Sequence, residues 1–490
     1  MRPRPLVRFL FAALASGAAL WLASCAVPLG PGYEIQKQTV AVRFESTPEP
    51  VLHVDAEYQL KNTGTRPLAN LELRLPARRF HVANLTAAWD AAGIAPVESP
   101  HNPRNSLLQF PEPWAMNARH TLRLAFEIRR AAPEERGLGF TSSAFFLPEG
   151  GWSPEFVQPR GLFGIGGVPP QKWDLLVSVP EDFRVHASGA RKKRSRKHGR
   201  LQLRFQQTPR DLYPFVVAGR YSESALIAGV RSMSLWTFTP LPKASLADMA
   251  SVLERELNAY DAALGTQSKK PIPLWIVECP QKEGCISGRN APFARFFGEE
   301  AGAANAEMIS LDTVLVDSSG DLSRIAAIAA PSLAASWLGY GRNPGFYEQE
   351  PPLSALPLFA AALGREAVQG PEARSVMIGR ALAQIPAQPK PGAEQDPAVE
   401  RAKGFLFFYA LRDLCGEAAF RNAIRHMLSA RQGRGFNLDD LIAAFEQETH
   451  QNIAEFVRLW MKHPGVPQEF RERYAAAQQA AAPLPEEKTP

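Results

Sequence analysis

The chain lacks several features that mark familiar classes of protein. Its 490 residues include four cysteines, and no two of its nine histidines lie within five residues of each other. This spacing excludes a His-x3-His metal site on one helix. Beyond residue 24 there is no apolar run of the ~20 residues that a membrane-spanning helix needs. We therefore expect a water-soluble remainder, and its length favours two or three domains.

The first residues predict export and lipid attachment. A basic start with three arginines precedes an apolar run, Phe9 to Leu22, that is too short to span a bilayer. The run leads into Leu22-Ala23-Ser24-Cys25, a lipobox in which small residues admit a signal peptidase and the thiol of Cys25 takes the lipid. Residues 1–24 are accordingly predicted to be a signal peptide; the alternative is an uncleaved anchor helix.

The residues after Cys25 predict where the protein lies. Residues 25–35 form the lipidated cysteine and a Pro/Gly-containing tether. Ala26, rather than Asp, resembles an outer-membrane address. We expect a protein of the bacterial cell envelope that is lipid-anchored to a membrane, with the outer membrane and the periplasmic face favoured.

Positive charge is concentrated in one stretch. The chain has 55 Lys and Arg against 49 Asp and Glu, and seven of the cations lie within residues 191–200. This stretch falls between two strand-like segments, Trp173–Val179 and Leu201–Phe205, and predicts a charged hairpin loop. A solvated loop and contact of basic loop 191–200 with anionic lipid or cell-wall polymer both stay open. Nucleic acid is excluded because interleaved aromatic residues are absent and the compartment is wrong.

The cysteines after the lipobox suggest one disulfide. Cys279 and Cys285 end a short loop that contains glycine, and in an oxidising compartment they predict a disulfide. A zinc site at this pair lacks both the usual spacing and a second pair of ligands. Cys415 lies in an apolar helical pattern, and this pattern predicts that its thiol is buried and free.

The first half of the chain has the pattern of β-structure. Residues 36–225 alternate apolar and polar side chains over short segments separated by turn residues, which predicts a β-sandwich domain. The clearest such segments are Thr39–Phe44, His53–Leu60, Leu71–Leu75 and Thr121–Ile128.

The second half changes to helical periodicity. Ser245–Leu264 predicts an amphipathic helix with Ser245 as its N-cap and Gly265 beyond its end. Further predicted elements are strands at Pro273–Val277 and Ile309–Val316, an Ala-rich helix at Leu322–Trp337 and several helices over 404–461. We assign an α+β domain to 226–365, a helical part to 366–474 and a disordered tail to 475–490.

An ordered set of short phrases resembles the gluzincin zinc aminopeptidases, the family of aminopeptidase N and leukotriene A4 hydrolase. The resemblance covers roughly residues 36–470. It implies an α+β multidomain fold: an N-terminal β-sandwich, a thermolysin-like α+β domain and a helical C-terminal part. The phrases include Tyr58–Gly64, Pro214–Tyr221, Trp337-Leu338-Gly339, Lys403-Gly404 and Trp460 ahead of Pro464–Pro467.

The resemblance also implies a zinc site whose ligands are missing here. The family binds Zn²⁺ through His-Glu-x-x-His on a helix and a later Glu, and the first Glu activates the metal-bound water. If Trp337-Leu338-Gly339 aligns with the family's Trp-Trp-Gly, the two His positions are Pro331 and Ala335. The general base is then Ser332, and the third ligand is Ser354.

Other parts of the family's site are absent as well. The transition-state Tyr precedes a Lys-Gly, where this chain has Arg401-Ala402-Lys403-Gly404. The Gly-x-Met-Glu-Asn segment that binds a substrate amino terminus has no counterpart in Gly284–Glu300. We therefore predict no metal, no cofactor and no catalytic residue.

These patterns favour a catalytically inactive, lipid-anchored peptidase relative that binds or scaffolds, with a peptide or protein ligand in the cleft between the sandwich and the helical part. One alternative is an accessory or assembly protein that works through the β domain alone. Another is an active hydrolase with Ser332 or Ser354 as nucleophile, although the chain around Ser354 lacks the Gly-x-Ser-x-Gly elbow.

Overall fold

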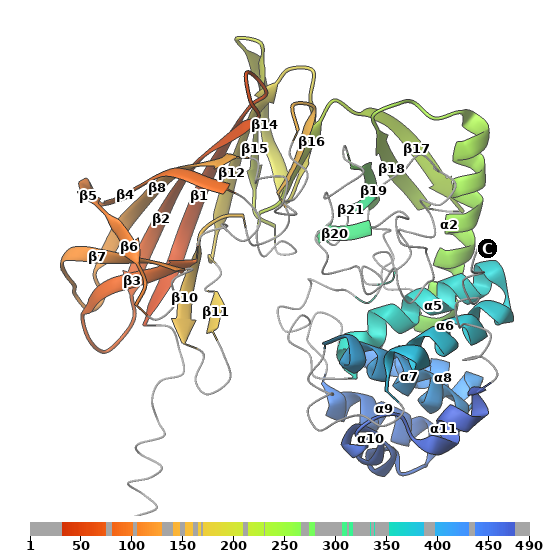
Figure 1. Cartoon of the computed structure of the whole chain (residues 1–490). Coiled ribbons are helices and arrows are strands. Elements are labelled where there is room, and N and C mark those ends of the chain that lie inside the picture. The colour runs from red at the N-terminus through yellow and green to blue at the C-terminus, as the bar shows by residue number, and fades with distance from the viewer. Residues whose placement is uncertain are drawn as a thin grey trace, which may run out of the picture.

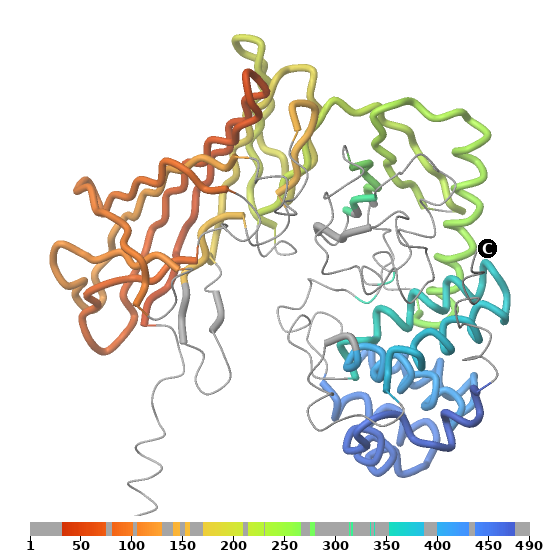
Figure 2. Tube along the Cα trace, viewed as in Figure 1, coloured from red at the N-terminus to blue at the C-terminus, as the bar shows by residue number. Residues whose placement is uncertain are grey.

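The fold was analysed in a computed structural model of the whole chain (Figures 1 and 2). Figure 2 shows the chain passing from an N-terminal β-rich half into a C-terminal half that ends in helices. The structure describes residues 32–74, 81–100, 105–129, 141–147, 152–159, 165–167, 170–208, 214–229, 231–265, 274–279, 306–310, 313–316, 334, 338, 352–386, 397–430 and 437–475.

The N-terminal half is dominated by an eight-stranded sheet in which β1 and β12 are parallel and the other neighbours are antiparallel. In spatial order its strands are β14 (Ala190–Lys197), β15 (Arg200–Gln206), β12 (Trp173–Pro180), β1 (Tyr33–Glu45), β2 (Val51–Asn62), β8 (Arg119–Arg129), β4 (His81–Trp89) and β5 (Ala92–Ile94).

A five-stranded sheet covers one face of this large sheet. Leu73 of the small sheet and Val42 and Leu52 of the large one belong to the same buried core. Alternate residues of β1 and β2 are buried, so the two-residue period predicted from the sequence is confirmed. The strands of the small sheet are β11 (Ile165–Gly167), β10 (Glu155–Pro159), β3 (Leu68–Arg74), β7 (Asn105–Trp114) and β6 (Pro96–Glu98).

The prediction of a charged loop at 191–200 was wrong. Residues 190–197 form edge strand β14, and the turn is confined to His198 and Gly199, both of which have positive φ. The run carries no apolar alternation, so it gave no strand signal. It pairs because β15 presents a free edge, and its side chains stay exposed on both faces.

A three-stranded sheet joins the two halves of the molecule. It contains β13 (Arg184–Ala187), β16 (Val216–Gly219) and β9 (Ala144–Leu147). Phe146 and Val217 of this sheet share a buried cluster with Leu315 of the C-terminal half. His186 stacks on Trp275 with ring centroids 3.7 Å apart, so the junction is packed and apolar.

The C-terminal half begins with a second five-stranded sheet. Its spatial order is β17 (Ser222–Ala228), β18 (Arg231–Thr237), β19 (Leu274–Glu278), β21 (Thr313–Val316) and β20 (Ala306–Ser310). The boundary assigned at residue 225 falls inside β17. The single strand predicted at Ile309–Val316 is instead the end of β20 followed by β21, which are antiparallel.

The predicted helix at 245–264 is α2 (Lys243–Leu264), with a different start. Pro242 is the N-cap, and Leu246 N–H donates to Pro242 O at 3.2 Å. Ser245 therefore already lies within the first turn of the helix. Ser245 is therefore no cap. The predicted end is confirmed because Gly265 has a φ of 81° and its N–H donates to Asp261 O at 3.0 Å.

The helices after α2 pack with it around one large core. These later helices are η4 (Leu353–Ala355), α5 (Leu356–Gln369), α6 (Pro371–Gln384), α7 (Pro397–Cys415), α8 (Glu417–Ala430), α9 (Leu438–Thr449), α10 (Ile453–Lys462) and α11 (Gln468–Arg473). None of the described helices is long and apolar enough to cross a membrane.

Candidate functional site

The segment aligned with the family's zinc helix is described at Ala334 and Leu338. Both side chains are buried in the helical core, and Leu338 N–H donates to Ala334 O at 3.0 Å, the spacing of one helical turn. Pro331, Ser332 and Ala335 lie outside the described residues. The described atoms therefore place this turn inside the core of the C-terminal half.

The position aligned with the third zinc ligand lies in η4. Ser354 is half-buried there, between the buried side chains of Leu353 and Ala355. A Cβ at Gly404 of α7 would approach Ala355 Cβ to 2.8 Å and Pro352 O to 3.3 Å. Glycine at position 404 therefore lets α7 pack directly on the segment that carries Ser354.

Arg401 is on the same helix as Gly404, one turn earlier. Its side chain is half-buried, and its Nε is buried with no hydrogen-bond acceptor among the described residues. The elements that carry Ser354 and Arg401, η4 and α7, are in contact. Arg401 adds a fixed positive charge to α7.

Lys403 fastens α7 to the end of α10. It is 8% exposed, and its Nζ donates to Met461 O at 3.2 Å and also to His463 O. These are orphan carbonyls at a helix C-terminus, where a cation is favourable. The Lys-Gly pair that supported the resemblance therefore has two packing roles in this chain.

A buried carboxyl group lies between α2 and α5. Glu256 is 1% exposed, and burial raises its pKa to about 8 against the opposing effect of Arg365. One turn later Tyr260 is buried, and a Cβ at Gly364 would come within 2.7 Å of the Tyr260 hydroxyl. Burial, and then the nearby Glu256, raises the pKa of Tyr260 well above its usual range. This group was missed at the sequence level.

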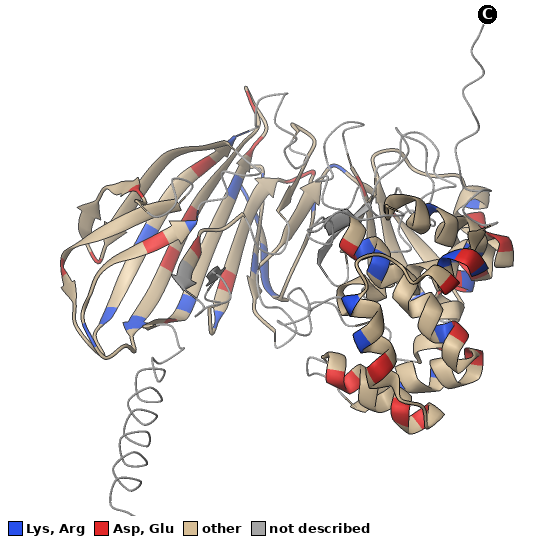
Figure 3. Cartoon of the chain, turned by 60° about the horizontal axis from the view of Figure 1, so that its bottom comes forward, with Lys and Arg blue, Asp and Glu red and all other residues tan. Residues whose placement is uncertain are grey.

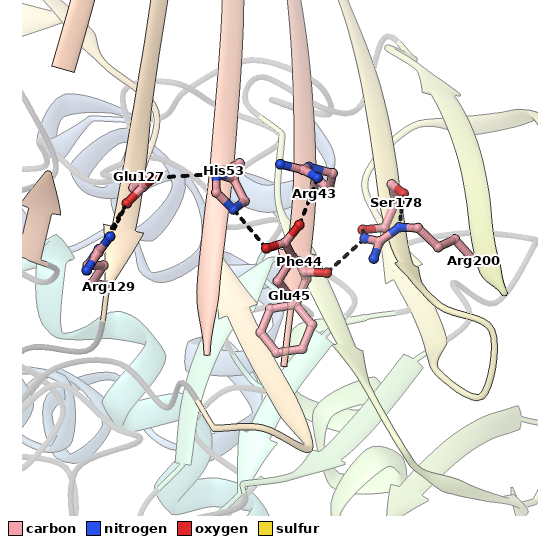
Figure 4. Close-up of polar contacts among 8 residues, drawn as sticks. All are labelled: Arg43, Phe44, Glu45, His53, Glu127, Arg129, Ser178 and Arg200. Carbon is pink, nitrogen blue, oxygen red and sulfur yellow. Dashed lines mark hydrogen bonds and ion pairs between the residues drawn. The ribbon is translucent and has the colours of Figure 1, made fainter. Parts of the chain in front are cut away.

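Among the described histidines, His53 has the most carboxylate neighbours, and it lies on the eight-stranded sheet of the N-terminal half (Figure 4). His53 is 3.3 Å from Glu45 and 3.7 Å from Glu127. Arg43 pairs with Glu45 at 2.7 Å, and Arg129 pairs with Glu127 at 2.6 Å. The hydrogen bond from Arg129 lowers the pKa of Glu127. Because both carboxylates have arginine partners, the group is a surface ion-pair network.

No group of three or more His, Cys, Asp or Glu side chains with metal-binding geometry occurs among the described residues. Cys279 is buried and disulfide-bonded. Cys285 and the lipobox Cys25 lie outside the described residues, so the Cys279–Cys285 pairing and the lipidation stay predictions. Cys415 is a free thiol, half-buried at the end of α7, and burial raises its pKa to about 11.

Comparison with known proteins gives a fold and no sequence family. No family model and no curated protein sequence matches the chain. Among solved structures, an M1 zinc metallopeptidase from Deinococcus radiodurans matches with a TM-score of 0.56 and 17% identity over 89% of this chain and 95% of that one. This chain has an M1-like two-domain fold.

Two further structures give the same picture. A point mutant of the Deinococcus enzyme bound to a Tyr-Ser-Ala substrate matches with a TM-score of 0.55 and 17% identity, over 89% of this chain and 95% of that one. A two-domain M1 zinc metallopeptidase mutant bound to L-arginine matches with a TM-score of 0.53 and 16% identity over the same shares. The α+β multidomain fold implied by the resemblance is thereby confirmed.

Proposed function

We propose that this protein is a lipid-anchored, catalytically inactive M1-like protein that binds a peptide or protein in the cell envelope. The observation that carries the proposal is the set of residues at the aligned ligand positions. Pro331 and Ala335 have no lone pair for a metal, and a neutral hydroxyl at Ser354 is a poor zinc ligand. Ser332 also cannot act as the carboxylate base. These residues do not fit the family's zinc.

The packing around the site supports the alignment on which this argument rests. A Cβ at Gly404 would lie only 2.8 Å from Ala355 Cβ, so glycine at this position lets α7 contact η4, and Ser354 and Arg401 come from elements that touch. The sequence also contains no His-Glu-x-x-His. A shift in the alignment therefore does not recover the motif.

Peptide binding needs no metal. Strand β20 is the last strand of its sheet among the described residues, and an extended peptide can add to such an edge by main-chain hydrogen bonds. Arg401 provides a cation on α7, in the same half of the molecule, that suits a carboxylate. The Deinococcus mutant was solved with a Tyr-Ser-Ala substrate, and we carry peptide binding over from it.

The alternative of a β domain that works alone has less support. Phe146, Val217 and Tyr221 of the N-terminal half are buried against the C-terminal half, so they would become exposed if residues 226–470 were removed. A deletion would thus confound lost function with an exposed apolar face. Point substitutions at Arg401 separate the two models, because they leave this junction intact.

The alignment can be tested by restoring the motif. If the alignment is right, the variant Pro331→His, Ser332→Glu, Ala335→His and Ser354→Glu should bind one zinc per chain by elemental analysis, because it restores the family's three ligands and its general base. The matched control keeps both Glu replacements and places Gln instead of His, as Pro331→Gln, Ser332→Glu, Ala335→Gln and Ser354→Glu. Equal zinc in the two variants, or none in the first when its circular dichroism is unchanged, would contradict the alignment.

A further inference from the structure

Strand β14 is an exposed edge with charge of a single sign. It is the terminal strand of the eight-stranded sheet, and among the described strands it pairs with β15 alone. Six of its eight residues are Lys or Arg, and all six are exposed. None of them makes an ion pair with any described residue. They are Arg191, Lys192, Lys193, Arg194, Arg196 and Lys197.

The neighbouring strand adds to this positive charge. Lys193 lies opposite Arg204 and Lys197 lies opposite Arg200 in the β14–β15 register. Like charges directly across a strand pair are destabilising, so the hairpin carries an electrostatic cost. Elsewhere on the strands and helices acidic and basic residues are interspersed (Figure 3). The concentration of cations is therefore local to this edge.

We propose that the free edge of β14 docks on an anionic lipid bilayer. Side chains of a strand point alternately to the two faces of the sheet, and a plane that meets the sheet edge-on is reached by both rows. All six cations then contribute to one planar contact of about 25 Å in length. A surface that bears phosphate charges at lipid density matches this arrangement, because each Lys or Arg near it gains attraction.

The position of the proposed anchor agrees with this contact, and in this respect the inference rests on the proposed function. Strand β1, which follows the tether, is three strand positions from β14, about 14 Å away across the sheet. An extended chain from Cys25 to Gly32 spans about 25 Å. A bilayer lying along β14 is therefore within reach of a lipid on Cys25, and the protein would lie with the edge of its large sheet on the membrane.

The test uses residues 25–490 with Cys25→Ser, so that no lipid contributes. Partition is measured by sedimentation with vesicles of phosphatidylglycerol and phosphatidylethanolamine and with vesicles of phosphatidylcholine. We expect binding to the anionic vesicles alone, weakened by salt. Lys192→Gln, Arg194→Gln and Arg196→Gln together should weaken it about 100-fold.

The matched control removes the same charge from the helical half. Lys243, Arg255 and Lys462 are exposed as well, and their replacement by Gln should leave vesicle binding within twofold of the parent. Equal loss in both triple variants, or no binding to anionic vesicles, overturns the proposal. Binding to soluble polyphosphate without binding to vesicles overturns it too, in favour of a polymer. Neither result bears on zinc, so the proposed function is judged separately.

Discussion

Two regions of the C-terminal half differ in how far they keep the residues of an M1 peptidase: the helical framework of η4, α7 and α10, and the positions aligned with the zinc ligands. In the framework, Gly404 fits against η4 and Lys403 closes the end of α10, each by a contact that few other residues can make. In the alignment that we propose, the zinc-ligand positions of an M1 peptidase are occupied by Pro331, Ala335 and Ser354, and none of these residues is a zinc ligand. In this alignment, residues that maintain the packing are retained while residues needed for zinc catalysis are not. Packing and catalysis therefore constrain the sequence separately, and a structural match reports only the packing.

If packing of the helical framework determines the stability of the protein, substitutions in this framework should have the largest effects on the free energy of unfolding. Glu256 has a pKa of about 8 in the folded state against 4.5 for a free carboxyl group. The folded protein therefore retains a proton that the unfolded chain loses between these values, and the free energy of unfolding falls as pH rises through this window. Glu256→Gln removes this dependence. Above pH 8 the variant should gain up to about 5 kcal/mol over the parent.

The measurement is urea unfolding of both proteins from pH 5 to pH 9. The gain should grow with pH and level off above the folded pKa. Parallel curves for parent and variant would mean that the carboxyl group of Glu256 is solvated in solution, contrary to the packing between α2 and α5.

Lys403→Met should have the next largest effect. The methionine keeps an apolar stem of similar length but leaves the carbonyls of Met461 and His463 without their charged donor. We expect a loss of about 3 kcal/mol in the free energy of unfolding. Lys462→Met, at an exposed site on the neighbouring α10, is the control and should change little. Equal values for the two would show that Lys403 is solvated.

Gly404→Ala is expected to cost about 2 kcal/mol. The added Cβ would lie 2.8 Å from Ala355 Cβ, so α7 and η4 must separate. Gly93→Ala in β5 is the matched control and should leave the stability nearly unchanged, because no atom lies within 4 Å of the added Cβ. A melting temperature unchanged in both would show that α7 and η4 are not in close contact.

The smallest effect should come from the site itself. Ser354→Ala removes a hydroxyl from a half-buried position of η4, and we expect a change within about 0.5 kcal/mol, measured in the same unfolding assay. A loss above about 2 kcal/mol would mean that Ser354 has a structural partner, and the contrast between framework and site would weaken.

Much of the fold could be predicted because its signals are local. Alternation identified β1 and β2, and Gly265 marked the end of α2. Strand β14 could not be found this way, because a uniformly charged run has no alternation and its pairing depends on the free edge of β15. The start of α2 was misplaced because Ser245 has the composition of a cap, while the first turn closes on Pro242.

The site was predicted unevenly for similar reasons. A residue order shared with a known family pointed to Ser354 and Arg401, whose elements do touch. The burial of Glu256 was not predicted. Glu256 shares a helical face with the apolar residues Leu253 and Tyr260, and a carboxyl group on such a face indicates burial. Its partner Arg365 is more than a hundred residues away, and such a pairing cannot be read from local sequence.

We propose that this M1-like framework holds no zinc and cleaves no peptide. The direct measurement is the zinc content of residues 25–490 with Cys25→Ser, together with cleavage of aminoacyl and endopeptidase substrates with and without a chelator. The account predicts substoichiometric zinc and no chelator-sensitive cleavage. One tightly bound zinc per chain with chelator-sensitive activity would contradict it.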